Sequence, residues 1–71
     1  MAISIPVRLG RRISSLREKR GLSQTQLADM AAIGRAHVSQ IENGAVAARI
    51  DTLHAIAAAL DLTLAEMFKG V

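Results

Sequence analysis

Apolar residues recur every three to four positions along most of the chain, which is the spacing of side chains on one face of an α-helix. In the first such stretch, Leu9, Ile13 and Leu16 share a face. Pro6 falls in the first turn, where the missing N–H of proline costs little. The pattern predicts a first helix that runs from Pro6 to about Arg20.

Two segments, SQTQ at 23–26 and TLAE at 63–66, have the form of a capping box. In a capping box the first side chain accepts a hydrogen bond from the fourth backbone N–H, and the fourth side chain accepts one in return. The segments predict a second helix over 24–31 and a short final helix that starts at residue 64.

Two more helices are predicted between these. Gly34 precedes and Gly44 follows an amphipathic stretch, which predicts a third helix ending at about Glu42. An apolar stripe predicts a fourth helix, although no strong turn residue fixes its start. The stripe comprises Ile50, Leu53, Ile56, Ala57 and Leu60. The expected fold is all-α, a compact five-helix domain spanning residues 1–71.

The connection between the second and third predicted helices is very short. Only Ala32 and Ile33 lie between the second helix and Gly34, the expected N-cap of the third. So short a turn excludes an antiparallel hairpin and makes the helices cross steeply, with the small residue Ala28 at the contact. The predicted helix-turn-helix covers about 23–42 and leaves one face of the third helix free.

That free face, within GRAHVSQIENG (34–44), differs from an ordinary solvated surface. Val38 and Ile41 fall on the inner side at about 100° per residue. The opposite side carries amide, hydroxyl and methyl groups instead of the Glu and Lys expected of a helix built only for solubility. Its residues are Ala36, Ser39, Gln40 and Asn43, with Arg35 at the start.

A protruding helix of this kind fits the major groove of B-form DNA, which is about 12 Å wide. Gln40 can pair with the N6 and N7 edge of adenine, Arg35 can reach guanine or a phosphate, and Ala36 can touch a thymine methyl. At the start of the second helix, Ser23, Gln24 and free backbone N–H groups predict a phosphate contact. The pattern therefore predicts double-stranded DNA as the partner.

The charge distribution agrees with a polyanionic partner. Residues 1–44 carry seven Lys and Arg side chains against three acidic ones, whereas residues 45–71 carry two against three. The first part would therefore face the polyanion, and the alternative is an ordinary solvated helix surface. At 71 residues, with 1% aromatic residues, the core must be aliphatic and only just sufficient. We therefore expect that the domain forms a homodimer, which would add to its stability.

The sequence contains no residue pattern typical of a catalytic site or a metal site. His37 and His54 are the only histidines, and no carboxylates cluster near them in the sequence. His37, on the flank of the third helix, is interpreted as a phosphate contact or a packing residue rather than a metal ligand. The serines lack a base and an orienting group. We expect no enzyme activity, no metal and no cofactor.

The absence of cysteine fits a reducing compartment. The N-terminal run MAISIPVRLG is short and is interrupted by Pro6 and Arg8, so it predicts neither a signal peptide nor a membrane span. The expected location is the cytoplasm, with association to the nucleoid when DNA is bound.

The run GLSQTQLADMAAIGRAHVSQIENG (21–44) resembles the helix-turn-helix of the phage-repressor and Cro type, the Xre family. LGRRISSLREKRG before it and IDTLHAIAAALDLTLAEMF after it share the resemblance. The resemblance implies a compact five-helix domain of the lambda-repressor-like type that binds operator DNA, usually as a dimer on a two-fold site. It also implies backbone or base contact by Gln24, base reading by Arg35, Ala36, Ser39 and Gln40, and phosphate contact by Asn43.

The chain departs from the family pattern at the turn. Many members have glycine where this chain has Ala32, a position that often needs positive φ. Gly34 replaces the usual Ser or Thr cap and is weaker by a few tenths of a kcal/mol. Ala48 and Arg49 stand where Pro and Ser commonly precede the fourth helix. We expect these departures to affect stability more than function.

In similar proteins, residues at the positions of Arg17 and Glu42 form a partly buried ion pair that pins the recognition helix. The resemblance implies the same structural pair here. The alternative is two solvated charges that contribute under ~1 kcal/mol.

A second face of the fourth predicted helix is rich in alanine and allows another helix to approach closely. We expect a homodimer seam there, formed by Ala55, Ala58, Ala59 and Leu62 with Val46, Met67 or Phe68 at its rim. The alternative is that alanine is simply the best helix former and is tolerated outside.

Together these features predict a sequence-specific DNA-binding transcriptional regulator, a repressor that binds a palindromic operator as a homodimer. Half-sites should lie about one helical turn apart. One alternative keeps the fold in an antitoxin or restriction-modification controller, with a toxin or other protein as partner. The other is a protein-interaction module that uses the fold only as scaffold.

Overall fold

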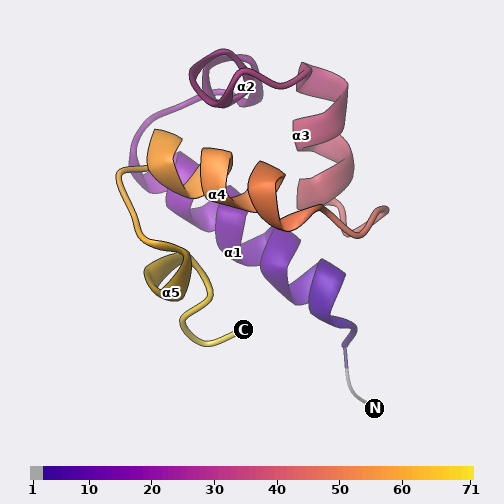
Figure 1. The fold of residues 1–71 in the computed structure, drawn as a ribbon. Helices are drawn as coiled ribbons and strands as arrows, with labels where there is room; N and C mark the ends of the chain where they lie inside the picture. The colour runs from indigo at the N-terminus through magenta and orange to yellow at the C-terminus, as the bar shows by residue number, and fades with distance from the viewer. Residues whose placement is uncertain (1–2) are drawn as a thin grey trace.

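A computed structural model describes residues 3–71 and contains five α-helices in that range. In Figure 1, α1 crosses the molecule behind α4, α2 and α3 lie at one end, and α5 lies at the other. The bounds are α1 Ile5–Lys19, α2 Gln24–Ala31, α3 Arg35–Glu42, α4 Ile50–Ala59 and α5 Leu64–Met67. The predicted all-α, five-helix fold is confirmed.

The core is aliphatic, as the composition predicted. Ile13 of α1, Leu27 of α2, Ile56 of α4 and Met67 of α5 are all fully shielded from solvent. Each helix thus contributes its apolar stripe to one cluster, and α3 joins it through Val38. Burial of this shared face, more than helix propensity, holds such short helices in place.

Both predicted capping boxes are present. The Ser23 hydroxyl accepts a hydrogen bond from the Gln26 N–H at 3.0 Å, and the Gln26 side chain accepts one from the Ser23 N–H at 2.8 Å. Thr63 and Glu66 form the same reciprocal pair at the start of α5, at 3.1 and 2.9 Å. These caps fix where α2 and α5 begin.

Two glycines let α1 approach the end of α3 closely. A Cβ on Gly10 would collide with the carbonyl oxygens of Ile41 and Glu42, the second at 2.5 Å. Gly44 has φ +71°, and a Cβ there would lie 2.7 Å from the Cα of Val7. Backbone packing of this kind sets the position of α3, and Gly10 was not singled out from the sequence.

One residue of the predicted apolar stripe is not buried. Ile50 remains 66% exposed, because it is the first residue of α4 and stands before the helix enters the core. Within residues 3–71, no helix is long and apolar enough to cross a membrane.

Candidate nucleic-acid interface

The turn between α2 and α3 adopts the conformation that the sequence predicted. Ala32 has φ 56° and ψ 41°, the left-handed region in which a Cβ is unfavourable. The Ile33 N–H donates to the Ala28 carbonyl at 3.0 Å, which closes the end of α2. The chain thereby turns sharply between α2 and α3, and α3 runs across the end of the molecule (Figure 1).

Helix α3 has the two faces predicted for it. Val38 and Ile41 are buried, at 1% and 2% exposure. Among the predicted DNA-contact residues of α3 and its C-cap, Ser39 and His37 are half-buried and four others are exposed. The exposed residues are Arg35, Ala36, Gln40 and Asn43. The structure therefore places the residues predicted to contact bases on one accessible face of α3. Gly34 is the N-cap of this helix and makes no side-chain hydrogen bond.

The predicted ion pair between Arg17 and Glu42 is confirmed. The Arg17 Nε and Nη2 donate to the two carboxylate oxygens of Glu42 at 2.8 and 3.0 Å, and Nη1 donates to the Leu22 carbonyl at 2.7 Å. The side chains are only 13% and 4% exposed. The hydrogen bond to Glu42 raises the pKa of the Arg17 guanidinium, against the opposing effect of burial. This bidentate pair joins α1 to the last residue of α3.

The predicted phosphate residues at the start of α2 already have partners in the protein. The Ser23 hydroxyl accepts the capping hydrogen bond, although its own O–H stays available as a donor. Gln24 is half-buried, and its Nε2 donates to Glu42 at 3.1 Å. This bond was not predicted from the sequence, because it depends on how α2 and α3 are angled to each other and helical spacing does not reveal that angle.

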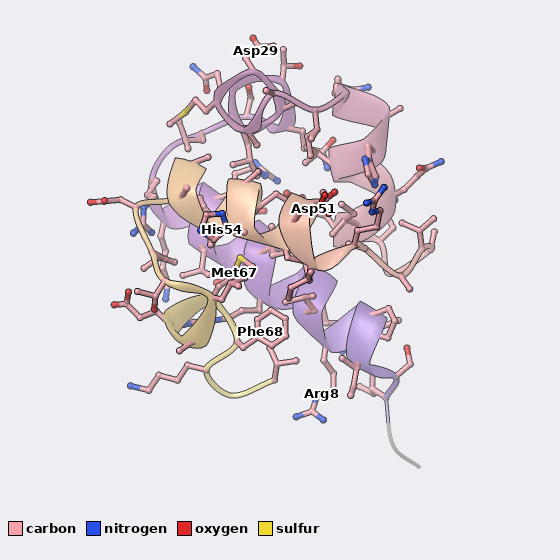
Figure 2. All side chains as sticks on the ribbon, viewed as in Figure 1. Arg8, Asp29, Asp51, His54, Met67 and Phe68 are labelled. Atoms are coloured by element: carbon pink, nitrogen blue, oxygen red, sulfur yellow. The ribbon has the colours of Figure 1, made fainter. Side chains whose placement is uncertain are left out.

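Part of the basic charge lies away from this face. The Arg12 guanidinium donates to the carbonyls of Glu66 and Met67 at 3.0 and 3.3 Å, and Arg8 reaches the Gly70 carbonyl at 3.4 Å. In Figure 2, Arg8 stands at the opposite end of the molecule from α3. Arg12 thus lies at the C-terminal end of α5, where backbone carbonyls carry partial negative charge, and Arg8 bonds to the segment that follows α5. The excess of basic charge predicted for residues 1–44 therefore does not all lie beside α3, since Arg8 and Arg12 bond to the C-terminal segment.

The alanine face of α4 is less free than predicted. Ala58 is exposed, but Ala55, Ala59 and Leu62 are half-buried against the core. Met67, predicted at the rim of the dimer seam, is fully buried. That placement is wrong, because α5 folds back and inserts this side chain under α4.

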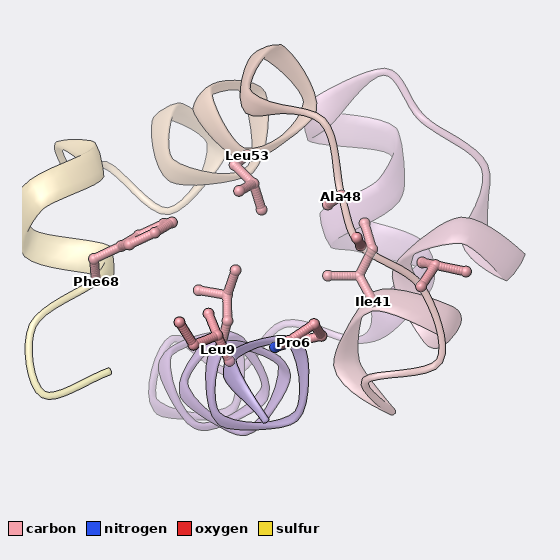
Figure 3. Close-up of a pocket in the computed structure, with 9 residues that line it drawn as sticks. Pro6, Leu9, Ile41, Ala48, Leu53 and Phe68 are labelled. Carbon is pink, nitrogen blue, oxygen red and sulfur yellow. The ribbon is translucent and has the colours of Figure 1, made fainter. Parts of the chain in front are cut away.

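An apolar hollow lies elsewhere, between the start of α1, the loop that follows α3, the start of α4 and the end of α5 (Figure 3). Its volume is about 150 Å³, and Ile5 and Phe68 on its wall are 62% and 36% exposed. The remaining lining residues are also apolar: Pro6, Leu9, Ile41, Val46, Ala47, Ala48 and Leu53. In the part of the chain that the structure describes, no group of three or more His, Cys, Asp or Glu is placed to hold a metal ion.

Comparison with known proteins assigns the family. The helix-turn-helix family model matches residues 13–67. Control protein C.MunI from a Mycoplasma species is 37% identical over 68 residues, which cover 94% of this chain and 92% of that protein. The chain belongs to the helix-turn-helix family. The family predicted from the sequence is thus confirmed.

Other helix-turn-helix proteins are similar over most of the chain. The transcriptional regulator PuuR of Escherichia coli K12 is 34% identical over 60 residues, but the match covers 84% of this chain and only 32% of PuuR. The restriction-modification controller C.AhdI from Aeromonas hydrophila superposes with a TM-score of 0.86 at 32% identity, covering 87% of this chain and 94% of that one. A structure of the SinR/SinI complex matches with a TM-score of 0.80 at 28% identity, covering 87% and 61%. The homologues are transcriptional regulators and controller proteins.

Proposed function

We propose that this helix-turn-helix protein is a sequence-specific DNA-binding transcriptional regulator that acts as a repressor. The observation that carries the proposal is the exposed face of α3, held by a buried ion pair and two buried aliphatic anchors. In this proposal Arg35, Ala36, Ser39 and Gln40 contact base edges, because their side chains share the face that would enter a major groove. Ser23, Gln24, His37 and Asn43 contact phosphates around it.

The proposed regulator binds as a homodimer on a palindromic operator, with the hollow beside Phe68 as the contact surface. An exposed hollow lined by apolar residues can receive an apolar side chain from a partner. Its volume of about 150 Å³ equals that of a cavity that holds one benzene ring. Phe68 is the only aromatic residue and lies partly exposed on its wall.

A two-fold contact presents the same patch from both partners, so each copy would offer both a ring and a hollow. Ile41, near the end of α3, lines the hollow. A second copy seated there would therefore place the ends of the two recognition helices on either side of the two-fold axis. This is the arrangement in which two such helices enter successive major grooves.

A restriction-modification controller is the second candidate function, supported by the names of C.MunI and C.AhdI. It keeps the same DNA chemistry, and an antitoxin paired with a toxin would also keep it. The SinR/SinI complex supports a protein partner for a fold of this kind. The third possibility is a protein-interaction module in which α3 contacts no DNA. The polar outward face of α3 argues against it. In each case we propose a cytoplasmic protein without catalytic activity or cofactor.

Selection of bound duplexes from a random pool tests the function. The expected result is a two-fold symmetric consensus, with affinity that falls steeply as salt rises because phosphate contacts release counterions. Equal affinity for every duplex would contradict sequence-specific binding. An absence of any duplex binding would leave the interaction module as the function of the fold.

A further inference from the structure

Glu42 is a buried carboxylate at which three helices meet. Arg17 of α1 neutralises its charge through two hydrogen bonds, at 2.8 and 3.0 Å. Gln24, the first residue of α2, adds a third bond from its Nε2 to Oε1 at 3.1 Å. Gln24, the second partner, belongs to the rim of the proposed DNA-binding surface and not to the core.

This bond fixes which way round the Gln24 amide lies. An ionised carboxylate accepts hydrogen bonds and cannot donate them, so the NH2 end of the amide must face Glu42. One N–H is used in the bond. The second N–H and the carbonyl oxygen have no hydrogen-bond partner among the described residues, 3–71, and the side chain remains half-exposed.

We infer that Glu42 is a positioning residue for DNA binding, which holds the Gln24 amide so that its free N–H donates to a phosphate. The inference rests on the proposed function of the fold. A side chain that is ordered before binding loses less rotamer freedom when the complex forms, and its contact is correspondingly stronger. Because Glu42 is also the last residue of α3, one carboxylate sets the phosphate contact on α2 relative to the reading face of α3.

The hold on Gln24 is measurable without DNA. Nitrogen-15 relaxation of the side-chain amides should give Gln24 an order parameter near that of rigid backbone, about 0.85. Gln40 is the matched control, since it is an exposed glutamine on α3, and its amide should fall below about 0.6. A Gln24 amide as mobile as that of Gln40 would overturn the inference.

A double-mutant cycle in DNA affinity tests the consequence. Gln24→Ala should weaken binding to the selected duplex roughly 10-fold in the wild-type background. In a background with Arg17→Met and Glu42→Leu, the same substitution should weaken binding less than about 2-fold, because Gln24 is no longer held. The apolar pair is chosen because it leaves no unpaired buried charge. Equal factors in both backgrounds would contradict a positioning role for Glu42.

Gln40→Ala controls for the position of α3. Its effect on affinity should be the same in both backgrounds, since Gln40 has no contact with Glu42 in the hydrogen-bond network. If the wild-type protein binds no duplex, the proposed function fails, whereas the amide relaxation still decides the hold on Gln24. If the wild type binds and the cycle is additive, only the role of Glu42 fails. Should the apolar pair not fold, the relaxation measurement alone decides.

Discussion

The Arg17 guanidinium on α1 donates two hydrogen bonds, of 2.8 and 3.0 Å, to the Glu42 carboxylate on α3. Both side chains have little exposure to solvent. Replacing either residue by alanine leaves the other charge buried and unpaired, which costs about 3–5 kcal/mol. We therefore expect Arg17→Ala and Glu42→Ala each to lower the free energy of unfolding by that amount, and the double variant to lose far less than their sum. Urea denaturation measures all three.

The pair Arg49 and Asp51 provides the matched control for this cycle. Their side chains are 84% and 69% exposed, and the closest approach is 3.5 Å. The coupling between them should stay below about 1 kcal/mol. Additive losses at Arg17 and Glu42 would show that their hydrogen bonds contribute nothing as a pair.

The left-handed conformation of Ala32 predicts an unusual stabilising substitution. Ala32→Gly should raise the free energy of unfolding by about 1 kcal/mol, because glycine adopts this conformation without steric cost. In a domain of this size that corresponds to a rise in Tm of about 4–8 °C. Ala58→Gly, at an exposed position inside α4, should instead destabilise by about 1 kcal/mol. A decrease in Tm for Ala32→Gly would contradict strain in the turn.

The close approach at Gly10 predicts that even one methyl group is too large there. Gly10→Ala should destabilise the protein by about 1–3 kcal/mol, since the new Cβ would collide with backbone carbonyls of α3, which can yield only if the end of that helix shifts. It should also weaken DNA binding, because relief of the collision displaces the end of α3. Thermal unfolding and duplex titration measure the two effects.

Gly34→Ala is the control for that substitution. A Cβ at Gly34 meets no atom within 4 Å, and its φ of −73° suits any residue. Its effect on stability should therefore stay below about 1 kcal/mol, which is the cost of replacing glycine by the less favourable alanine at an N-cap. Equal losses at Gly10 and Gly34 would show that the approach of α1 to α3 does not require glycine.

The position of the dimer seam is tested by charges placed on two different surfaces. Ile5→Glu should raise the dissociation constant of the dimer at least about 30-fold, because the carboxylate would be buried in the apolar hollow. Ala58→Glu, on the alanine face of α4, should leave that constant unchanged. Sedimentation equilibrium gives both values, and affinity for a duplex with one half-site shows that the Ile5→Glu monomer still recognises DNA.

The reverse outcome has a clear meaning. If Ala58→Glu separates the subunits and Ile5→Glu does not, the alanine face is the seam and the hollow has another use. A wild-type protein that stays monomeric in solution and on DNA would contradict the homodimer itself.

Local chemistry allowed much of this protein to be read from its sequence. The capping boxes at Ser23 and Thr63, the two-residue turn at Ala32 and the division of α3 into anchors and an outward face depend on residues close together in the chain. Each of these features has a short-range cause, such as a hydrogen bond across four residues or a spacing of 3.6 residues per turn. Sequence alone was therefore sufficient for the helices and for the outward face of α3.

Tertiary packing decided the rest. Three features depend on contacts between segments that are distant in the chain. They are the bond from Gln24 to Glu42, the close approach that leaves no room for a Cβ at Gly10, and the burial of Met67 under α4. The apolar hollow likewise arises only where four separate segments meet. Periodicity shows which face of a helix is apolar, but the angles at which helices pack determine which residues of that face are covered and which remain open to a partner.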